Sequence, residues 1–229
     1  MIYIFYILIN EVIIFKKDEQ LKTQVKIGNI SKESRKISRF NWILDLLPLL
    51  SLTLFITGVM TLLQSILPID LANGGVVRPP LIEQKVATFV TLKLIIIAIF
   101  QWPVAYIIRN KSSHFKFRLS LISLLTGFIF LSLSNFLING YVLILLAFLP
   151  LTIALCIFLP SASDAIIKSS PKKYRGSAIA LYSQCFGISS LTIPWMAGKL
   201  IDTYNTAFHV WLIVSLICIF LMPICKRIK

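Results

Sequence analysis

The chain has 229 residues, of which 57% are hydrophobic and only 14% are charged, and its formal net charge is +14. An ordinary soluble domain is about half apolar and about a quarter charged, so a soluble core of this length could not bury so much apolar surface. The composition therefore excludes a soluble globular protein and indicates a protein of the lipid bilayer.

Two segments precede the first long apolar run. Residues 1–15 are apolar but too short to cross the hydrocarbon core, and they contain Asn10 and Glu11. We interpret them either as a short interfacial helix or as the end of a longer spanning helix. Residues 16–41 are polar and contain eight basic side chains. They predict a flexible cytoplasmic linker that lies against the anionic inner surface of the membrane.

The rest of the chain, residues 42–229, is predicted to be an all-α membrane domain. A helix needs about 20 apolar residues to cross the hydrocarbon core. Six runs come close to this length: Ile43–Leu67, Val86–Ile108, Leu119–Leu137, Tyr141–Leu159, Ala178–Ala197 and Ala207–Cys225. Prolines at positions 48, 103, 150 and 194 fall within them. Membrane helices tolerate such prolines because neighbouring groups satisfy the freed backbone.

The placement of Lys and Arg predicts the orientation, because basic loops stay on the cytoplasmic side of a membrane. Nineteen of the twenty-three basic residues lie in residues 16–41, in the loops after the second and fourth runs, and in the C-terminal tail. The intervening loops contain only three. This pattern predicts a multi-pass protein of the cell membrane with the linker 16–41 and the C-terminus in the cytoplasm. The clustering between runs also argues against nucleic acid as a partner.

Several polar side chains within the runs are candidates for a substrate or ion pathway. Lys93 is the sharpest, because ionisable groups inside a membrane are costly, but its long stem could instead reach the outer interface. Gln101, two turns further along, could line the same polar strip. Asp45 lies near a helix N-terminus, which favours a carboxylate, and proton coupling is the alternative. The other candidates, each of which could equally make a helix contact, are Gln64, Tyr182 and Gln184.

Two cytoplasmic connections contain recognisable patterns. The connection after the second run ends in a basic cluster that includes Arg109 and Lys111. The connection after the fourth run reads Pro171-Lys172-Lys173-Tyr174-Arg175-Gly176. Asp164 and Arg175 flank this second connection, and we expect them either to pair as part of an inner gate or to anchor the topology.

The fifth run is rich in small residues and closes with glycine and aspartate. Five of its positions recur at steps of three and four and so share one helix face: Ser183, Gly187, Ser190, Pro194 and Gly198. Small residues on one face let another helix backbone approach closely, so this face is predicted to pack against a helix.

These features resemble the second half of a major facilitator superfamily transporter. In that family a proline–basic–arginine–glycine turn leads into a small-residue helix that closes with glycine and aspartate. The resemblance covers residues 16–229 and implies helices seven to twelve of a twelve-helix permease that is truncated at its N-terminus. Residues 1–15 would then be the end of helix six.

The resemblance implies a secondary transporter, preferably an exporter, that moves a small solute with a proton or ion gradient and needs no cofactor. Its partners would be the lipid bilayer, the solute and a separate N-terminal half or a second copy. The alternative is a non-transporting membrane subunit or the inactive fragment of a split transporter.

We do not expect an enzyme or a metal site. Neither an HExxH nor a GxSxG pattern occurs, and few acidic residues lie within the runs. The four cysteines, Cys156, Cys185, Cys218 and Cys225, show no metal-ligand spacing. Small apolar residues of buried helices explain them best.

Overall fold

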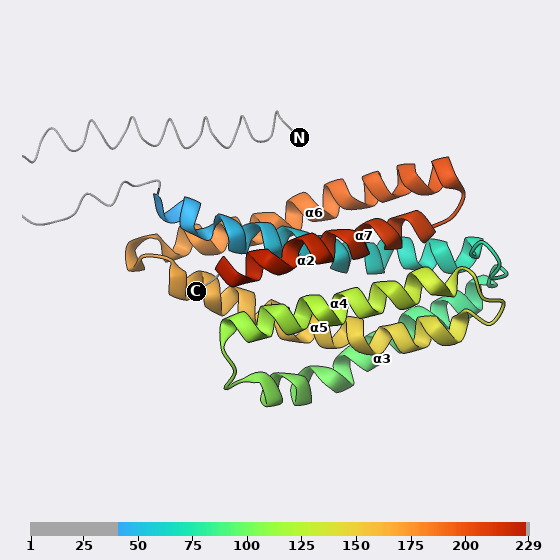
Figure 1. Ribbon diagram of the computed structural model, residues 1–229, viewed down its shortest axis with the longest axis horizontal. Helices are drawn as coiled ribbons and strands as arrows, with labels where there is room; N and C mark the ends of the chain where they lie inside the picture. Colours follow the sequence, from blue (N-terminus) through green and yellow to red (C-terminus); the bar gives the residue numbers. More distant parts are fainter. Residues whose placement is uncertain (1–40, 228–229) are drawn as a thin grey trace, which may run out of the picture. The chain divides into compact units, whose positions relative to one another are not determined.

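The computed structural model describes residues 41–227, and almost all of them belong to helices (Figure 1). The elements in chain order are α2 (Asn41–Asn73), α3 (Glu83–Ile108), α4 (Ser113–Ser134), α5 (Tyr141–Ser169), the 3-10 turn η1 (Lys172–Tyr174), α6 (Arg175–Tyr204), α7 (Phe208–Leu221) and the 3-10 turn η2 (Met222–Arg227). The predictions for residues 1–15 and for the linker before residue 41 lie outside the described residues.

Four of the described helices are long and apolar enough to cross a membrane, namely α2 from Leu46 onwards, α3, α4 and α5. This confirms an all-α protein with helices of membrane-spanning length. α6 has 30 residues but also a polar face, and α7 is apolar but has only 14 residues. The predicted run Ala207–Cys225 is longer than α7, because the chain continues from Met222 as the 3-10 turn η2, which contains Pro223. Spans at α6 and α7 stay predictions.

The first long helix extends further than the sequence predicted. α2 passes the predicted end at Leu67, continues through Pro68 and ends at Asn73. Gly74 follows with a left-handed φ of +81°, and its N–H donates to the carbonyl of Asp70 at 3.1 Å. This is a glycine C-terminal cap, which satisfies a carbonyl that the helix end would leave free. Asp70 is therefore a helix residue rather than a loop residue.

The helices pack side by side in an order that differs from the chain order. α2 packs mainly on α6, α4 lies between α5 and α7, and α3 packs mainly on α5. The α3–α4 and α5–α6 connections lie at the same end of this bundle as the start of α2 (Figure 1). The α2–α3, α4–α5 and α6–α7 connections lie at the other end. The loops predicted to be cytoplasmic therefore share one end.

α4 and α5 approach each other closely at Gly127. A Cβ atom added there would lie 2.5 Å from Cγ and 2.7 Å from Cδ2 of Leu151. Leu151 is buried and Ala147, one turn earlier, is also buried, so neither side of the contact has room to yield. Only glycine fits this crossing without moving one helix.

Gly127→Ala should therefore push α4 and α5 apart. We expect it to lower the free energy of unfolding by about 1–3 kcal/mol, the usual cost of overpacking. Gly187→Ala in α6 is the matched control, because an added Cβ there meets no atom within 4 Å. The control should be neutral or stabilising by up to about 1 kcal/mol, since alanine favours helix more than glycine. Thermal unfolding of both purified variants in detergent measures the difference, and equal effects would contradict the α4–α5 contact.

Candidate functional site

A buried ion pair holds the end of the bundle where α2 meets α3. Asp70 lies in the last turn of α2, and Arg78 lies in the connection that follows. Their Oδ1 and Nη2 atoms are 3.0 Å apart, and both side chains are fully buried. Charges taken out of water are costly unless they are paired and hydrogen-bonded, so this pair needs further partners.

Two more helices supply those partners. Arg78 donates from Nη1 to the hydroxyl of Ser134 in α4 at 2.8 Å, and from Nη2 to the carbonyl of Asp70 at 2.9 Å. The indole of Trp211 in α7 donates to Oδ2 of Asp70 at 3.2 Å. We call Asp70, Arg78, Ser134 and Trp211 the Asp70–Arg78 cluster. It joins α2, α4 and α7 through one guanidinium and one carboxylate.

The connection itself is pinned against α4 and α5. Val77 donates its backbone N–H to the carbonyl of Asn135 at 2.8 Å. A Cβ atom at Gly75 would lie 2.8 Å from the Cα of Asn135, so this turn requires glycine. The hydroxyl of Tyr141 donates to the carbonyl of Pro79. The α2–α3 connection is therefore held in place across this end of the described bundle.

Sequence reasoning missed the Asp70–Arg78 cluster because it placed both charged residues in a solvated loop. The available signal was a single acid and a single base, eight positions apart, around the Gly74-Gly75 turn. A turn at these glycines can bring the acid and the base into contact. The contribution of Trp211 carries no local signal, because it lies 141 positions from Asp70 in the chain.

Lys93 occupies a second unusual position. Its side chain is only 5% exposed, and Nζ donates to the carbonyl of Leu63 in α2 at 2.6 Å. Both residues lie ten positions from the nearer end of their helix, about 15 Å by helical rise, which is about half the hydrocarbon thickness. The ammonium therefore lies against the middle of α2, and both roles expected for Lys93, in a pathway or at the outer interface, stay predictions. Among the described residues it forms no salt bridge.

The other pathway candidates do not gather around Lys93. Gln101 is exposed on α3, so it shares no buried strip with Lys93. Gln64 follows Leu63 in α2 but is exposed. The side chain of Asp45 lies outside the described residues.

α6 packs on α2 with a face that the sequence did not single out. Ser189 donates to the hydroxyl of Thr57 at 2.9 Å, and Thr57 lies 3.4 Å from the carbonyl of Cys185. A Cβ atom at Gly58 would lie 2.9 Å from Cγ1 of Ile193. These α6 residues lie nearly opposite the predicted small-residue face.

The predicted small-residue face makes no close helix contact within the described part of the chain, so its packing against another helix stays a prediction. Ser183, Gly187 and Ser190 are exposed, and Pro194 and Gly198 are partly exposed. Added Cβ atoms at Gly187 and Gly198 meet nothing within 4 Å. Of the neighbouring candidates, Gln184 is exposed, whereas Tyr182 is half-buried.

Asp164 and Arg175, which we expected either to pair in an inner gate or to anchor the topology, do not form a salt bridge with each other. Asp164 is bound by Lys168, with Nζ 2.6 Å from Oδ2, and both side chains are mostly exposed. Lys168 lies one helical turn away on α5, so it reaches the carboxylate sooner than a residue beyond the turn at Pro171. Arg175 is exposed at the start of α6.

The two basic connections, α3–α4 and α5–α6, are exposed at the end of the bundle opposite the Asp70–Arg78 cluster. Arg109, Lys111 and Gly176 are exposed, and an added Cβ at Gly176 meets nothing within 4 Å. The turn between α5 and α6 is anchored by Tyr174, whose ring stacks on Trp42 with centroids 5.4 Å apart. Basic side chains here can therefore meet water or an anionic surface.

The described residues contain no group of three His, Cys, Asp or Glu side chains that could hold a metal ion. In comparisons with known proteins, no family model, curated protein or solved structure matched this chain. The resemblance to major facilitator transporters therefore stays a prediction.

Removing one charge of the Asp70–Arg78 cluster should destabilise the protein strongly, because the other charge stays buried without its partner. We expect Arg78→Met or Asp70→Asn to lower the free energy of unfolding by about 3–5 kcal/mol. The double variant should recover much of this loss. Reversible unfolding in mixed micelles, followed by circular dichroism, measures these differences.

Lys85→Met is the matched control, because Lys85 is an exposed base near the same end of the bundle. It should change the free energy of unfolding by less than about 0.5 kcal/mol. An Arg78→Met variant as mild as this control would mean that the cluster does not hold the end of the bundle together.

Proposed function

We propose that this chain is a multi-pass membrane protein with six transmembrane helices, and that it forms one wall of the pathway of a secondary transporter. The observation that carries this proposal is the exposed polar face of α6. Ser183, Gln184 and Ser190 are exposed near the middle of this helix, and Gly187 lies between them with open space beside it. Polar groups at membrane depth are favoured inside a bundle or a water-filled cavity rather than against lipid.

A second uncovered surface on α3 supports the same proposal. Only 11% of the most apolar stretch of α3 is buried, whereas 44–56% is buried in the other three long apolar helices. Thr88, Thr91 and Gln101 are exposed along this helix. Both α3 and α6 contact α2, the helix whose Leu63 carbonyl binds Lys93. A second six-helix unit facing α3 and α6 would complete a pathway.

Lys93 is the residue that we propose for solute or proton coupling. Its ammonium lies at depth with one backbone carbonyl as its hydrogen-bond partner among the described residues. A small shift of α3 against α2 would turn this donor towards the pathway. The Asp70–Arg78 cluster is compatible with this coupling. It fixes the end of α2 to α4 and α7, so these three helices can move as one body.

The cargo that we propose is a small solute, and the transporter type is that of the major facilitator superfamily, on the resemblance of the turn Pro171–Gly176 and of the helix after it. Export is the proposed direction on the same ground. The proposed orientation places the linker 16–41 and the C-terminus in the cytoplasm, because the basic connections share one end of the bundle.

If the polar face of α6 lines a pathway, a cysteine on it should meet water. We expect Gln184→Cys to react with a charged, membrane-impermeant thiol reagent about tenfold faster than Leu216→Cys, because only a hydrated thiol ionises readily. Leu216 is the matched control, since it is 47% exposed on the apolar helix α7. The four native cysteines are buried and should add little background.

Modification rates are measured in membranes of cells that produce each variant, with mass spectrometry of the intact protein. Equal and slow rates at both positions would mean that this face of α6 is sealed. That result would contradict a pathway along α6 and favour a non-transporting membrane subunit.

The orientation has a separate test on two exposed asparagines. Asn110 lies in the α3–α4 connection and Asn139 lies in the α4–α5 connection, at opposite ends of the bundle (Figure 1). We expect Asn139→Cys to be labelled in intact cells and Asn110→Cys only in inverted membrane vesicles. Labelling of both from one side would contradict the multi-pass orientation.

A further inference from the structure

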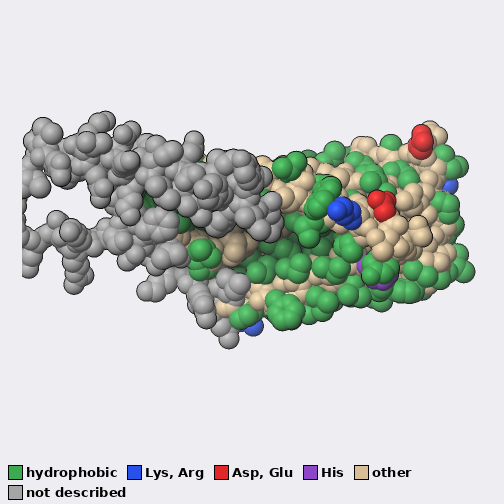
Figure 2. Space-filling view, turned by 90° about the horizontal axis from the view of Figure 1, so that it is seen from above, with side chains coloured by type: hydrophobic (Ala, Val, Ile, Leu, Met, Phe, Trp, Pro, Cys, Tyr) green, Lys and Arg blue, Asp and Glu red, His purple; other side chains and the backbone are tan. Residues whose placement is uncertain are grey.

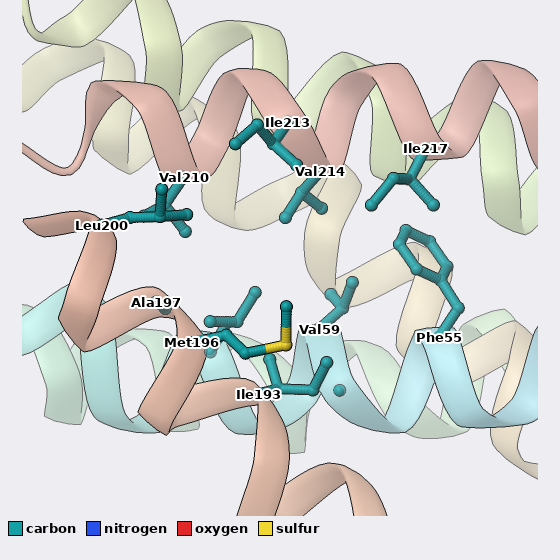
Figure 3. A pocket seen from close by; sticks show the side chains of 12 residues that line it. Phe55, Val59, Ile193, Met196, Ala197, Leu200, Val210, Ile213, Val214 and Ile217 are labelled. Atoms are coloured by element: carbon teal, nitrogen blue, oxygen red, sulfur yellow. The ribbon is translucent and has the colours of Figure 1, made fainter. Parts of the chain in front are cut away.

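α2, α6 and α7 enclose a groove whose lining is entirely apolar, as Figure 3 shows. Its volume is about 120 Å³, and each of the three helices contributes side chains to it. α6 packs mainly on α2 whereas α7 packs mainly on α4, so the groove lies between α6 and α7, with α2 at its floor. Val59, Ala197 and Val214 are buried in its walls.

Water is a poor occupant of this groove. A bound water needs two to four polar partners, and the side chains that line the groove offer none. Apolar cavities of about 150 Å³ stay dry in proteins and take up hydrocarbons of the size of benzene. The groove therefore favours a small hydrocarbon group, such as part of an alkyl chain.

The position of the groove indicates which hydrocarbon is at hand. Val59 lies at the middle of the membrane-spanning part of α2, Leu46–Asn73. The mouth opens sideways, because Met196, Ile213 and Ile217 on its rim are 55%, 38% and 39% exposed. The described part of the face that Figure 2 shows is mainly hydrophobic, with few charged side chains. A groove that opens sideways at mid-depth faces the acyl chains of the bilayer.

A cation lies above one end of the groove. Lys199 is exposed one turn beyond Met196, and its Nζ lies 4.0 Å from the centroid of the Trp195 ring. It forms no ion pair with any described residue. Its Cα lies about 9 Å by helical rise from Ile193 at the middle of the groove, and the flexible stem can reach the interface about 15 Å from the bilayer centre.

We propose that this groove binds one acyl chain of a membrane phospholipid whose phosphate lies at Lys199. The apolar lining takes the chain, and the ammonium of Lys199, extended on its flexible stem, meets the phosphate at the interface. The inference goes beyond transport, since it requires only that these helices lie in a bilayer. It assigns α6 a lipid-binding face in addition to its polar one.

Photolabelling in proteoliposomes tests this site. The probe is a phosphatidylcholine that carries a diazirine in the middle of one acyl chain, and mass spectrometry locates the labelled residues. We expect labelling of the groove residues of α6 and α7 about tenfold above that of the exposed apolar positions of α3, such as Ile99 and Ile107.

Two variants separate the parts of the site. Val214→Phe fills the groove and should lower its labelling about tenfold, since the chain can no longer be buried there. Leu216→Phe adds the same ring on the other side of α7 and should change nothing. Lys199→Gln should lower the labelling about threefold, as expected for an exposed charge, and its exposed position makes it safe for folding if Val214→Phe does not fold.

Three results would overturn the inference. One is equal labelling of the groove and of α3, which would mean that lipid only bathes the surface. Another is labelling that neither Val214→Phe, if it folds, nor Lys199→Gln lowers. The last is a groove protected from the probe, with crosslinks from Ile213 to a second copy or to residues 1–15, which would name a different occupant.

Discussion

Polar groups that leave water must find partners inside the protein, and this requirement explains much of the described structure. In α2, Thr53, Thr57, Thr61 and Ser65 each donate to the carbonyl four residues earlier, at 2.8–2.9 Å. These hydroxyls satisfy their hydrogen bonds within the helix and need none from lipid. A helix with many of them can therefore still lie in hydrocarbon. Buried charged side chains obey the same requirement over longer distances, and the pair Asp70–Arg78 joins helices that are far apart in the chain.

α2 is the element to which these longer contacts converge. Its last turn carries Asp70, which is held by Arg78 and Trp211. Its middle accepts the ammonium of Lys93 through a backbone carbonyl and contacts α6 through Thr57. One end of the bundle is therefore closed by a buried ion pair with several hydrogen bonds, whereas the middle holds a cation with a single neutral acceptor. The first arrangement suits a rigid scaffold, and the second is one that a modest movement can change.

α6 combines three surfaces with different physical characters. The face with Cys185 and Ser189 packs on α2 through small side chains and hydroxyls. The face with Gln184 is polar and uncovered, which favours water or another polar protein surface. Near its C-terminal end, Met196 lines an apolar groove that favours hydrocarbon. A helix with three such surfaces is less apolar than its neighbours, which explains why composition identifies it less clearly as a membrane span.

The sequence by itself determined the helical class, the approximate helix positions and the separation of basic from nearly uncharged connections. These follow from composition and from patterns within about one helix length, which act locally. Only the tertiary structure decided which faces meet: Thr57 finds Ser189 across 132 positions, and Asp70 finds Trp211 across 141. Local spacing pointed instead to the small-residue face of α6 and to Arg175 as a partner for Asp164. Such pairings depend on how whole helices cross, and no periodicity within one helix records its neighbour.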